Sequence, residues 1–489
     1  MIKPVMKTVV RPAHLMSAKV FITPEKASSA AQAAWRTFRI ASAAGFLVLL
    51  DTTAVVAAYA PLRAHFNSVS SADLSWTLNA YTALFAALLV PAVRLADLMG
   101  RKRIFLLGLA LFVLASALCA WAPGIGTLIA ARALQAVGAA MLTPASLALV
   151  LGAFPREKRA ADVGLFSAVG ALAAAVGPAF GSWVIEVSSW RWVFLINVPL
   201  GLLLWLTARR HLQESTSPET GARPDWLGIG LLVLGMGAVA WGIVRSESSG
   251  WIQPLGALAL GAALLIVFGF WARGRPAAAL DLSLFEDRSF LFVNLATAVF
   301  GMAFTAMFLS SFLFFMGTWG YPQGLAGWAV TPGPLMVIPV AIAAGRLAGR
   351  IGHRPLLVVG GVLYAVAQAW LSLRIGATPD DVATWLPAQL LSGPAVGLVL
   401  PALSGAAVAK LGPARFRVGG SVNSALRQMG GAAGAALAVA LIGSAGASLV
   451  QLQWMYAVLA GLGLLTALLC LPVQTRPGMQ TTTPAGAAP

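Results

Sequence analysis

The sequence predicts an all-α membrane protein with fourteen transmembrane helices. Apolar residues fill 59% of the 489 positions, whereas only 10% are charged, and the mean hydropathy is +0.84. Soluble domains carry roughly 25% charged residues, so most of this chain faces something other than water. A helix crosses a bilayer with about 20 apolar residues, and long unbroken apolar runs recur along the whole chain.

Fourteen apolar runs between charged or Pro/Gly-rich breaks define the expected helices. Backbone groups in hydrocarbon must hydrogen-bond within their own segment, and the runs are too long for barrel strands. In chain order they fall near residues 40–62, 74–95, 104–122, 126–150, 161–185, 191–209, 226–244, 251–271, 290–317, 325–349, 355–374, 383–409, 419–443 and 454–472.

Basic residues alternate from loop to loop in the way that orients a membrane protein. Of the 33 Lys and Arg, 27 fall on one side, four on the other, and Arg132 and Arg427 inside helices. Cytoplasmic loops are enriched in Lys and Arg, so we expect a multi-pass protein of the cytoplasmic (inner) membrane with both termini in the cytoplasm. This distribution accounts for the net charge of +17 without nucleic acid as a partner.

An internal repeat divides the chain into two similar halves. The loop that starts at Arg94 matches the loop that starts at Arg346, and the fourth and fifth helices match the twelfth and thirteenth at a similar offset. Two six-helix halves are a transporter architecture with a site near the midplane, although a chance likeness of Gly/Ala-rich helices is the alternative. We expect a basic cytoplasmic tail (1–35), a first six-helix bundle (36–210), a cytoplasmic linker (211–225), two inserted transmembrane helices (226–275), a second six-helix bundle (276–472) and a short cytoplasmic tail (473–489).

Several motifs carry a family resemblance. The run from Trp190 to Gly201 reads WRWVFLINVPLG, and it is joined by LDTT at 50–53, the Arg94 to Lys102 loop, RALQAVG at 132–138 and the Gly177-Pro178 pair. Together these motifs resemble the fourteen-helix drug:proton antiporter branch of the major facilitator superfamily, over about residues 40–472.

The resemblance implies proton-coupled export of amphipathic small molecules by alternating access of the two bundles. The expected partners are such a substrate, protons and the lipid bilayer; we expect a monomer with no cofactor and no metal. A facilitator or importer on the same fold is the first alternative. A membrane enzyme is the second, and it is disfavoured because all four histidines lie in tails or loops, away from any nucleophile.

Asp51 is the outstanding candidate for proton coupling. Of the sixteen acidic residues, it alone sits deep in an expected helix, about eleven residues from the cytoplasmic start. A carboxylate at that depth is costly when ionised, so it can take up and release a proton as water access alternates. The alternative is a structural Asp that hydrogen-bonds Thr52 or Thr53 and never titrates.

Arg132 and Arg427 are the two cations inside expected helices, and membrane arginines generally face the interior and pair there. Arg132 and Gln135 share one helical face, and the resemblance implies that their motif assists proton transfer. Both arginines could instead be buried struts, and spacing leaves open which of them reaches Asp51.

Two further motifs suggest gating. Small residues recur on one side of the fifth and thirteenth expected helices, including Gly177 beside Pro178, and Gly434; the resemblance associates them with gating between the bundles, and plain tight packing is the alternative. The loop formed by Arg94, Asp97, Gly100 and Arg101 can latch onto helix ends on the cytoplasmic side, or simply anchor the topology.

The residues that line the substrate cavity are the hardest feature to predict from the sequence. Aromatic, sulfur-containing and amide side chains in the expected helices suit amphipathic molecules, although each one taken singly is as readily a core residue. The candidates are Trp76, Asn79, Tyr81, Asn294, Phe304, Met307, Gln389 and Arg427.

Overall fold

The computed structural model describes residues 24–154, 159–215, 225–245, 252–275, 278, 280, 282–411, 413–442 and 448–475. The described part of the chain is helical and contains no strand, so the all-α class is confirmed. Most of the two expected tails and of the 211–225 linker lies outside the described residues.

The first group of helices runs from the start of the described chain to His211. Its elements are α1 (Pro24–Ala57), α2 (Tyr59–His65), α3 (Ser71–Met99), α4 (Arg101–Ala120), α5 (Ile125–Ala153), α6 (Arg159–Val187), α7 (Trp190–Leu195) and α8 (Asn197–His211). We call α1 to α8 the N-terminal group.

A helical pair and a second group follow. The pair is α9 (Trp226–Arg245) and α10 (Ile252–Ala272), and a short 3-10 helix lies at Leu282–Glu286. The second group, called the C-terminal group, consists of α11 (Arg288–Gly317), α12 (Gln323–Val330), α13 (Pro332–Ile351), α14 (Arg354–Arg374), a π-helical turn (Asp381–Trp385), α15 (Leu386–Val408), α16 (Pro413–Ile442) and α17 (Leu449–Leu469).

Twelve segments among the described residues are long and apolar enough to cross a membrane. The two remaining expected spans fall on α6 and α9, which are helical as well, with a shorter apolar stretch at Trp226–Val239. A multi-pass helical membrane protein is therefore confirmed, whereas fourteen spans stay a prediction.

Proline explains where the expected helices are interrupted. The first, sixth and tenth expected spans each divide, into α1 and α2, α7 and α8, and α12 and α13. A proline ring clashes with the carbonyl four residues before it and removes a backbone donor. Pro61 and Pro199 stand four residues after the ends of α1 and α7, and Pro332 opens α13.

The two groups repeat the same helix contacts. In the N-terminal group α1 packs on α6, and α5 packs on both α3 and α4; in the C-terminal group α11 packs on α16, and α15 packs on both α13 and α14. The groups meet where α3 contacts α16 and where α6 contacts α12 and α13. The helices of the two groups thus pack in corresponding ways.

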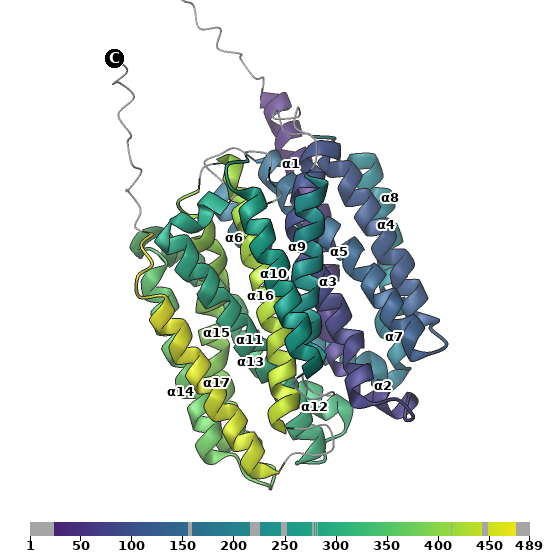
Figure 1. The fold of residues 1–489 in the computed structure, drawn as a ribbon, viewed down its shortest axis with the longest axis vertical. Coiled ribbons are helices and arrows are strands. Elements are labelled where there is room, and N and C mark those ends of the chain that lie inside the picture. The colour runs from purple at the N-terminus through teal and green to yellow at the C-terminus, as the bar shows by residue number, and fades with distance from the viewer. Residues whose placement is uncertain are drawn as a thin grey trace, which may run out of the picture.

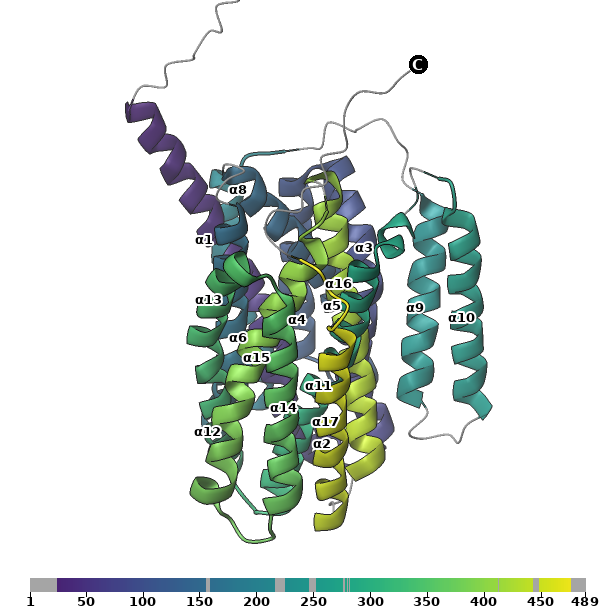
Figure 2. The same ribbon diagram turned by 90° about the vertical axis from the view of Figure 1, so that its left-hand side faces the viewer.

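The helical pair α9–α10 stands beside the two groups. Figure 2 shows both helices at one edge of the bundle, and α9 contacts α3 and α16, one helix from each group. Figure 1 places the start of α1 at one end of the bundle and α2, α7 and α12 at the other. We call the end where α1 begins the α1 end.

Two glycines allow the closest approach of α4 and α5, the helices that frame the site described below. A Cβ atom added to Gly108 would lie 2.8 Å from the carbonyl oxygen of Gly138, and one added to Gly138 would lie 2.6 Å from the backbone nitrogen of Phe112. The obstructing atoms belong to the backbone, so a side chain here must move a whole helix.

Gly138→Ala is therefore expected to destabilise the protein. Overpacking costs typically about 1–3 kcal/mol, which outweighs the roughly 1 kcal/mol that alanine adds in helix propensity. Gly126→Ala is the matched control, because on the same helix an added Cβ meets no atom within 4 Å. The measurement is the thermal midpoint of detergent-purified protein, and a Gly138→Ala midpoint equal to that of Gly126→Ala would contradict this packing account.

Candidate functional site: a buried ion pair in the N-terminal group

Asp51 lies in the interior of the N-terminal group, with 1% of its surface exposed. The threonines that follow it do not bond to it but turn back onto their own helix, where Thr52 Oγ1 donates to the Val48 carbonyl (2.8 Å) and Thr53 Oγ1 to the Leu49 carbonyl (2.9 Å). The carboxylate is thus left to partners on other helices.

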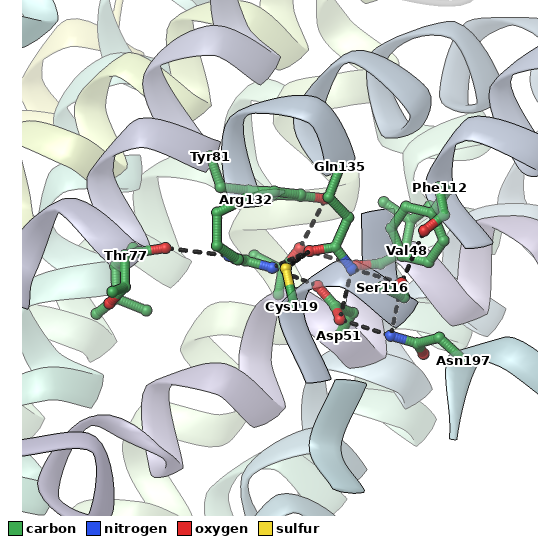
Figure 3. Close-up of polar contacts among 12 residues, drawn as sticks. Val48, Asp51, Thr77, Tyr81, Phe112, Ser116, Cys119, Arg132, Gln135 and Asn197 are labelled. Carbon is green, nitrogen blue, oxygen red and sulfur yellow. Dashed lines mark hydrogen bonds and ion pairs between the residues drawn. The ribbon is translucent and has the colours of Figure 1, made fainter. Parts of the chain in front are cut away.

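Three N–H donors from two helices converge on the Asp51 carboxylate (Figure 3). Arg132 Nη1 of α5 donates to Oδ2 at 2.8 Å, and Gln135 Nε2 of α5 and Asn197 Nδ2 of α8 donate to Oδ1 at 3.0 and 2.7 Å. An ionised carboxylate accepts hydrogen bonds at both oxygens, and bonds to charged groups are the strong ones. This arrangement fits Asp51 as an anion.

Arg132 is equally enclosed, with 1% of its surface exposed. Its Nε donates to the Thr77 carbonyl at 3.0 Å, Nη1 also donates to Gln135 Oε1 at 2.6 Å, and its guanidinium carbon lies 4.2 Å from the centre of the Tyr81 ring. The aromatic face stabilises a cation that water cannot reach. Asp51 and Arg132 are therefore an internal ion pair, and Arg132 is the arginine that reaches Asp51.

Ser116 fixes the two amide side chains. Its hydroxyl donates to the Phe112 carbonyl on its own helix α4 (2.8 Å) and accepts from Gln135 Nε2 at 2.8 Å and from Asn197 Nδ2 at 3.5 Å. We call Asp51, Arg132, Gln135, Asn197 and Ser116 the Asp51 cluster.

Two members of the Asp51 cluster were not expected from the sequence. Ser116 gave no signal, because a lone serine in an apolar run is common. Asn197 lies in the WRWVFLINVPLG run, and an amide among apolar residues is the signal that could have marked it. Tyr81, expected in the substrate cavity, is instead fully buried against Arg132.

The other expected cavity residues lie apart from the Asp51 cluster. On α3, Trp76 is partly exposed and Asn79 is buried. The rest belong to the C-terminal group. Asn294 Oδ1 accepts a hydrogen bond from Asn423 (3.1 Å), Met307 Sδ accepts one from Gln368 (3.4 Å), and Phe304 packs on Phe308 with 4.9 Å between the ring centres. The buried Gln389 lies against Gly333, and the backbone of Arg427 lies against Gly301.

The loop between α3 and α4 is held by the segment that follows α8. Gly100 adopts a positive φ of 105°, a conformation that favours glycine, and brings the first turn of α4 against Glu214. The Glu214 carboxylate accepts from the backbone nitrogens of Lys102 (3.0 Å) and Arg103 (3.2 Å). Negative charge at a helix N-terminus is favourable, so Glu214 caps α4.

Charged side chains of the same loop make further contacts within the N-terminal group. Arg101 Nη2 lies 3.4 Å from Asp97 Oδ1, and Lys102 Nζ donates to the Arg209 carbonyl in the last turn of α8 at 2.9 Å. Arg94 is partly exposed near the end of α3. The Lys102 contact joins the loop to α8.

The small-residue stripes lie within each group. Gly177 and Gly181 of α6 face Thr53 and Ala54 of α1, with Pro178 buried between them, and Gly434 of α16 faces the Met302 carbonyl of α11. The stripes thus permit close contact of corresponding helix pairs, α1–α6 and α11–α16.

Across the described residues, no group of three or more His, Cys, Asp or Glu could hold a metal ion, and Cys119 and Cys470 are free buried thiols. The Asp51 cluster is thus the described site with the most developed chemistry: a single acid with the donors needed to hold its charge.

Comparison with known proteins identifies the family. Residues 41–286 and 291–489 match the Major Facilitator Superfamily. Multidrug resistance protein Stp of Mycobacterium tuberculosis is 30% identical over 399 residues, which cover 80% of this chain and 73% of Stp. The puromycin resistance protein of Streptomyces alboniger is 34% identical over 414 residues, covering 82% of this chain and 80% of that protein.

A solved structure shows the same fold. A POT family transporter in complex with a thioalcohol-conjugated peptide superposes with a TM-score of 0.67 at 16% identity, covering 90% of this chain and 95% of the other. The sequence comparisons and the fold comparison agree with each other: the chain is a multi-pass membrane transporter that belongs to the Major Facilitator Superfamily.

Proposed function

We propose that this transporter exports amphipathic small molecules, among them toxic compounds, in exchange for protons by alternating access of its two helix groups. The observation that carries the proposal is the buried Asp51–Arg132 ion pair, a titratable group inside a membrane-spanning fold. Relatives named for multidrug and puromycin resistance support a drug as cargo.

Protonation of Asp51 is the step that couples the proton to movement. A proton on Asp51 removes the counter-charge of Arg132 inside a site that excludes water. A buried charge that loses its partner costs about 3–5 kcal/mol, so Arg132 and Gln135 of α5 and Asn197 of α8 must rearrange relative to α1. Proton binding therefore favours a different arrangement of these helices, and proton release restores the one observed.

The proposed topology has fourteen spans in the cytoplasmic membrane, with α6 and α9 added to the twelve segments that satisfy length and composition. The α1 end is cytoplasmic, as the excess of basic residues in its loops favours. The repeated helix contacts support the two six-helix bundles, 36–210 and 276–472, with 226–275 inserted between them. The functional unit is a monomer, because each chain holds both bundles.

Asp51→Asn is expected to abolish proton-driven export while downhill exchange of substrate persists. The amide keeps the side chain's size and its position in α1 but cannot carry a proton on and off. The measurement is uphill uptake of a drug into inside-out vesicles, which a protonophore should abolish in the unaltered protein; uptake insensitive to the protonophore would favour the facilitator alternative. Asp73→Asn, an exposed acid at the start of α3, is the control. Proton-driven uptake at full rate in Asp51→Asn would exclude this coupling site.

Asn197→Ala is expected to slow proton-driven transport. It removes one of the three N–H donors that hold the Asp51 carboxylate, and a hydrogen bond to a charged group contributes about 1.5–3 kcal/mol. The readout is the initial rate of protonophore-sensitive uptake into inside-out vesicles. Asn423→Ala, which removes a buried amide from the C-terminal group, should retain more of that rate, and a full rate in Asn197→Ala would refute the assignment.

We further propose that the Arg94 to Arg101 loop and its Glu214 cap form a cytoplasmic latch. Glu214→Ala removes the acceptor for two backbone N–H groups of α4, and loss of a cap costs about 0.5–2 kcal/mol. Hydrogen exchange at residues 101–104 should therefore accelerate several-fold, with slower transport. Glu186→Ala, at the other end of the bundle, serves as the control, and unchanged exchange in Glu214→Ala would rule out the latch.

A further inference from the structure

Arg427 is a deep cation without a protein partner in the described part of the chain. It stands at the middle of α16 (Pro413–Ile442), where its backbone packs against Gly301 of α11, and its side chain is partly exposed. Among the described residues its guanidinium makes no hydrogen bond, ion pair or ring contact. Arg132, the other deep cation, is bonded on several sides.

The position of Arg427 on α16 sets it among polar groups. Residues 422, 425, 426 and 429 of this helix are apolar and pack in the hydrophobic core shared with the N-terminal group. Polar residues occupy the other side of the helix, and one turn before Arg427 the Asn423 amide donates to Asn294 (3.1 Å) and Thr297 (2.7 Å) of α11. Arg427 therefore belongs to a polar side of α16 and not to its apolar packing side.

The charges deep inside the helices do not balance. Asp51 and Arg132 neutralise each other at 2.8 Å, so the described mid-membrane region retains the positive charge of Arg427. An intramembrane charge is costly and is generally matched by another protein group, by water or by a ligand. Because no described protein group matches it, a transported molecule is the natural counter-charge.

We propose that Arg427 binds an anionic group of the substrate, so that the preferred cargo is an amphipathic acid such as a carboxylate or sulfonate. This inference rests on the proposed export function. A guanidinium offers a planar pair of N–H donors that match a carboxylate. A cationic molecule would meet Arg427 as a like charge.

Two xanthene dyes of similar size and opposite charge test the proposal: fluorescein, an anion, and rhodamine 123, a cation. Binding to the purified full-length protein is measured by fluorescence anisotropy, which does not depend on proton coupling. We expect tighter binding of fluorescein, a roughly ten- to hundredfold loss of that affinity in Arg427→Gln, partial retention in Arg427→Lys, and unchanged or improved binding of rhodamine 123.

Arg63→Gln, an exposed arginine in α2, is the matched control and should bind both dyes normally. The thermal midpoint of each variant separates loss of the site from loss of the fold. Unaltered fluorescein affinity in a folded Arg427→Gln, or preference of the unaltered protein for rhodamine 123, would overturn the inference. Binding that depends on Arg427 without proton-driven transport would instead refute the proposed function and leave the anion site standing.

Discussion

The Asp51–Arg132 ion pair is the interaction on which the rest of the site depends. Two charges with 1% exposure persist inside a helical membrane protein only when each is matched, and here α1, α3, α4, α5 and α8 supply the matching groups. The close α4–α5 contact at Gly108 and Gly138 serves the same end, since it brings Ser116 to Gln135. The close packing of α4 on α5 and the pairing of the buried charges therefore depend on each other in the N-terminal group.

The two groups share their packing but not their chemistry. Corresponding helix pairs pack alike in both, yet the N-terminal group encloses a charged pair, whereas the C-terminal group encloses the neutral Asn294, Thr297 and Asn423 network and carries Arg427. Under the proposed function, the proton would act in the N-terminal group and the cargo in the C-terminal group, at separate places in one chain.

Hydropathy and charge predicted the helices and singled out the polar residues within them because both signals are local, whereas they left open which arginine pairs with Asp51. Asp51, Arg132 and Gln135 stand out as polar residues in apolar runs. The approach of Asn197 to Asp51 joins positions 146 residues apart, and only the packing of α8 on α1 brings them together. The helix breaks near Pro61, Pro199 and Pro332 were not predicted, because a hydropathy profile does not detect the clash between a proline ring and a backbone carbonyl. The capping of α4 by Glu214 was not predicted either, because it depends on the conformation of a loop and not on a periodic sequence pattern.

The α9–α10 pair has a mechanical consequence. Because α9 contacts both α3 and α16, any change in the angle between the two groups must alter at least one of these contacts. The α9–α10 pair is therefore sensitive to the angle between the two groups. Only 17% of the Pro254–Ala272 segment of α10 is buried, so a fluorophore attached there would report a change in that angle from the edge of the protein.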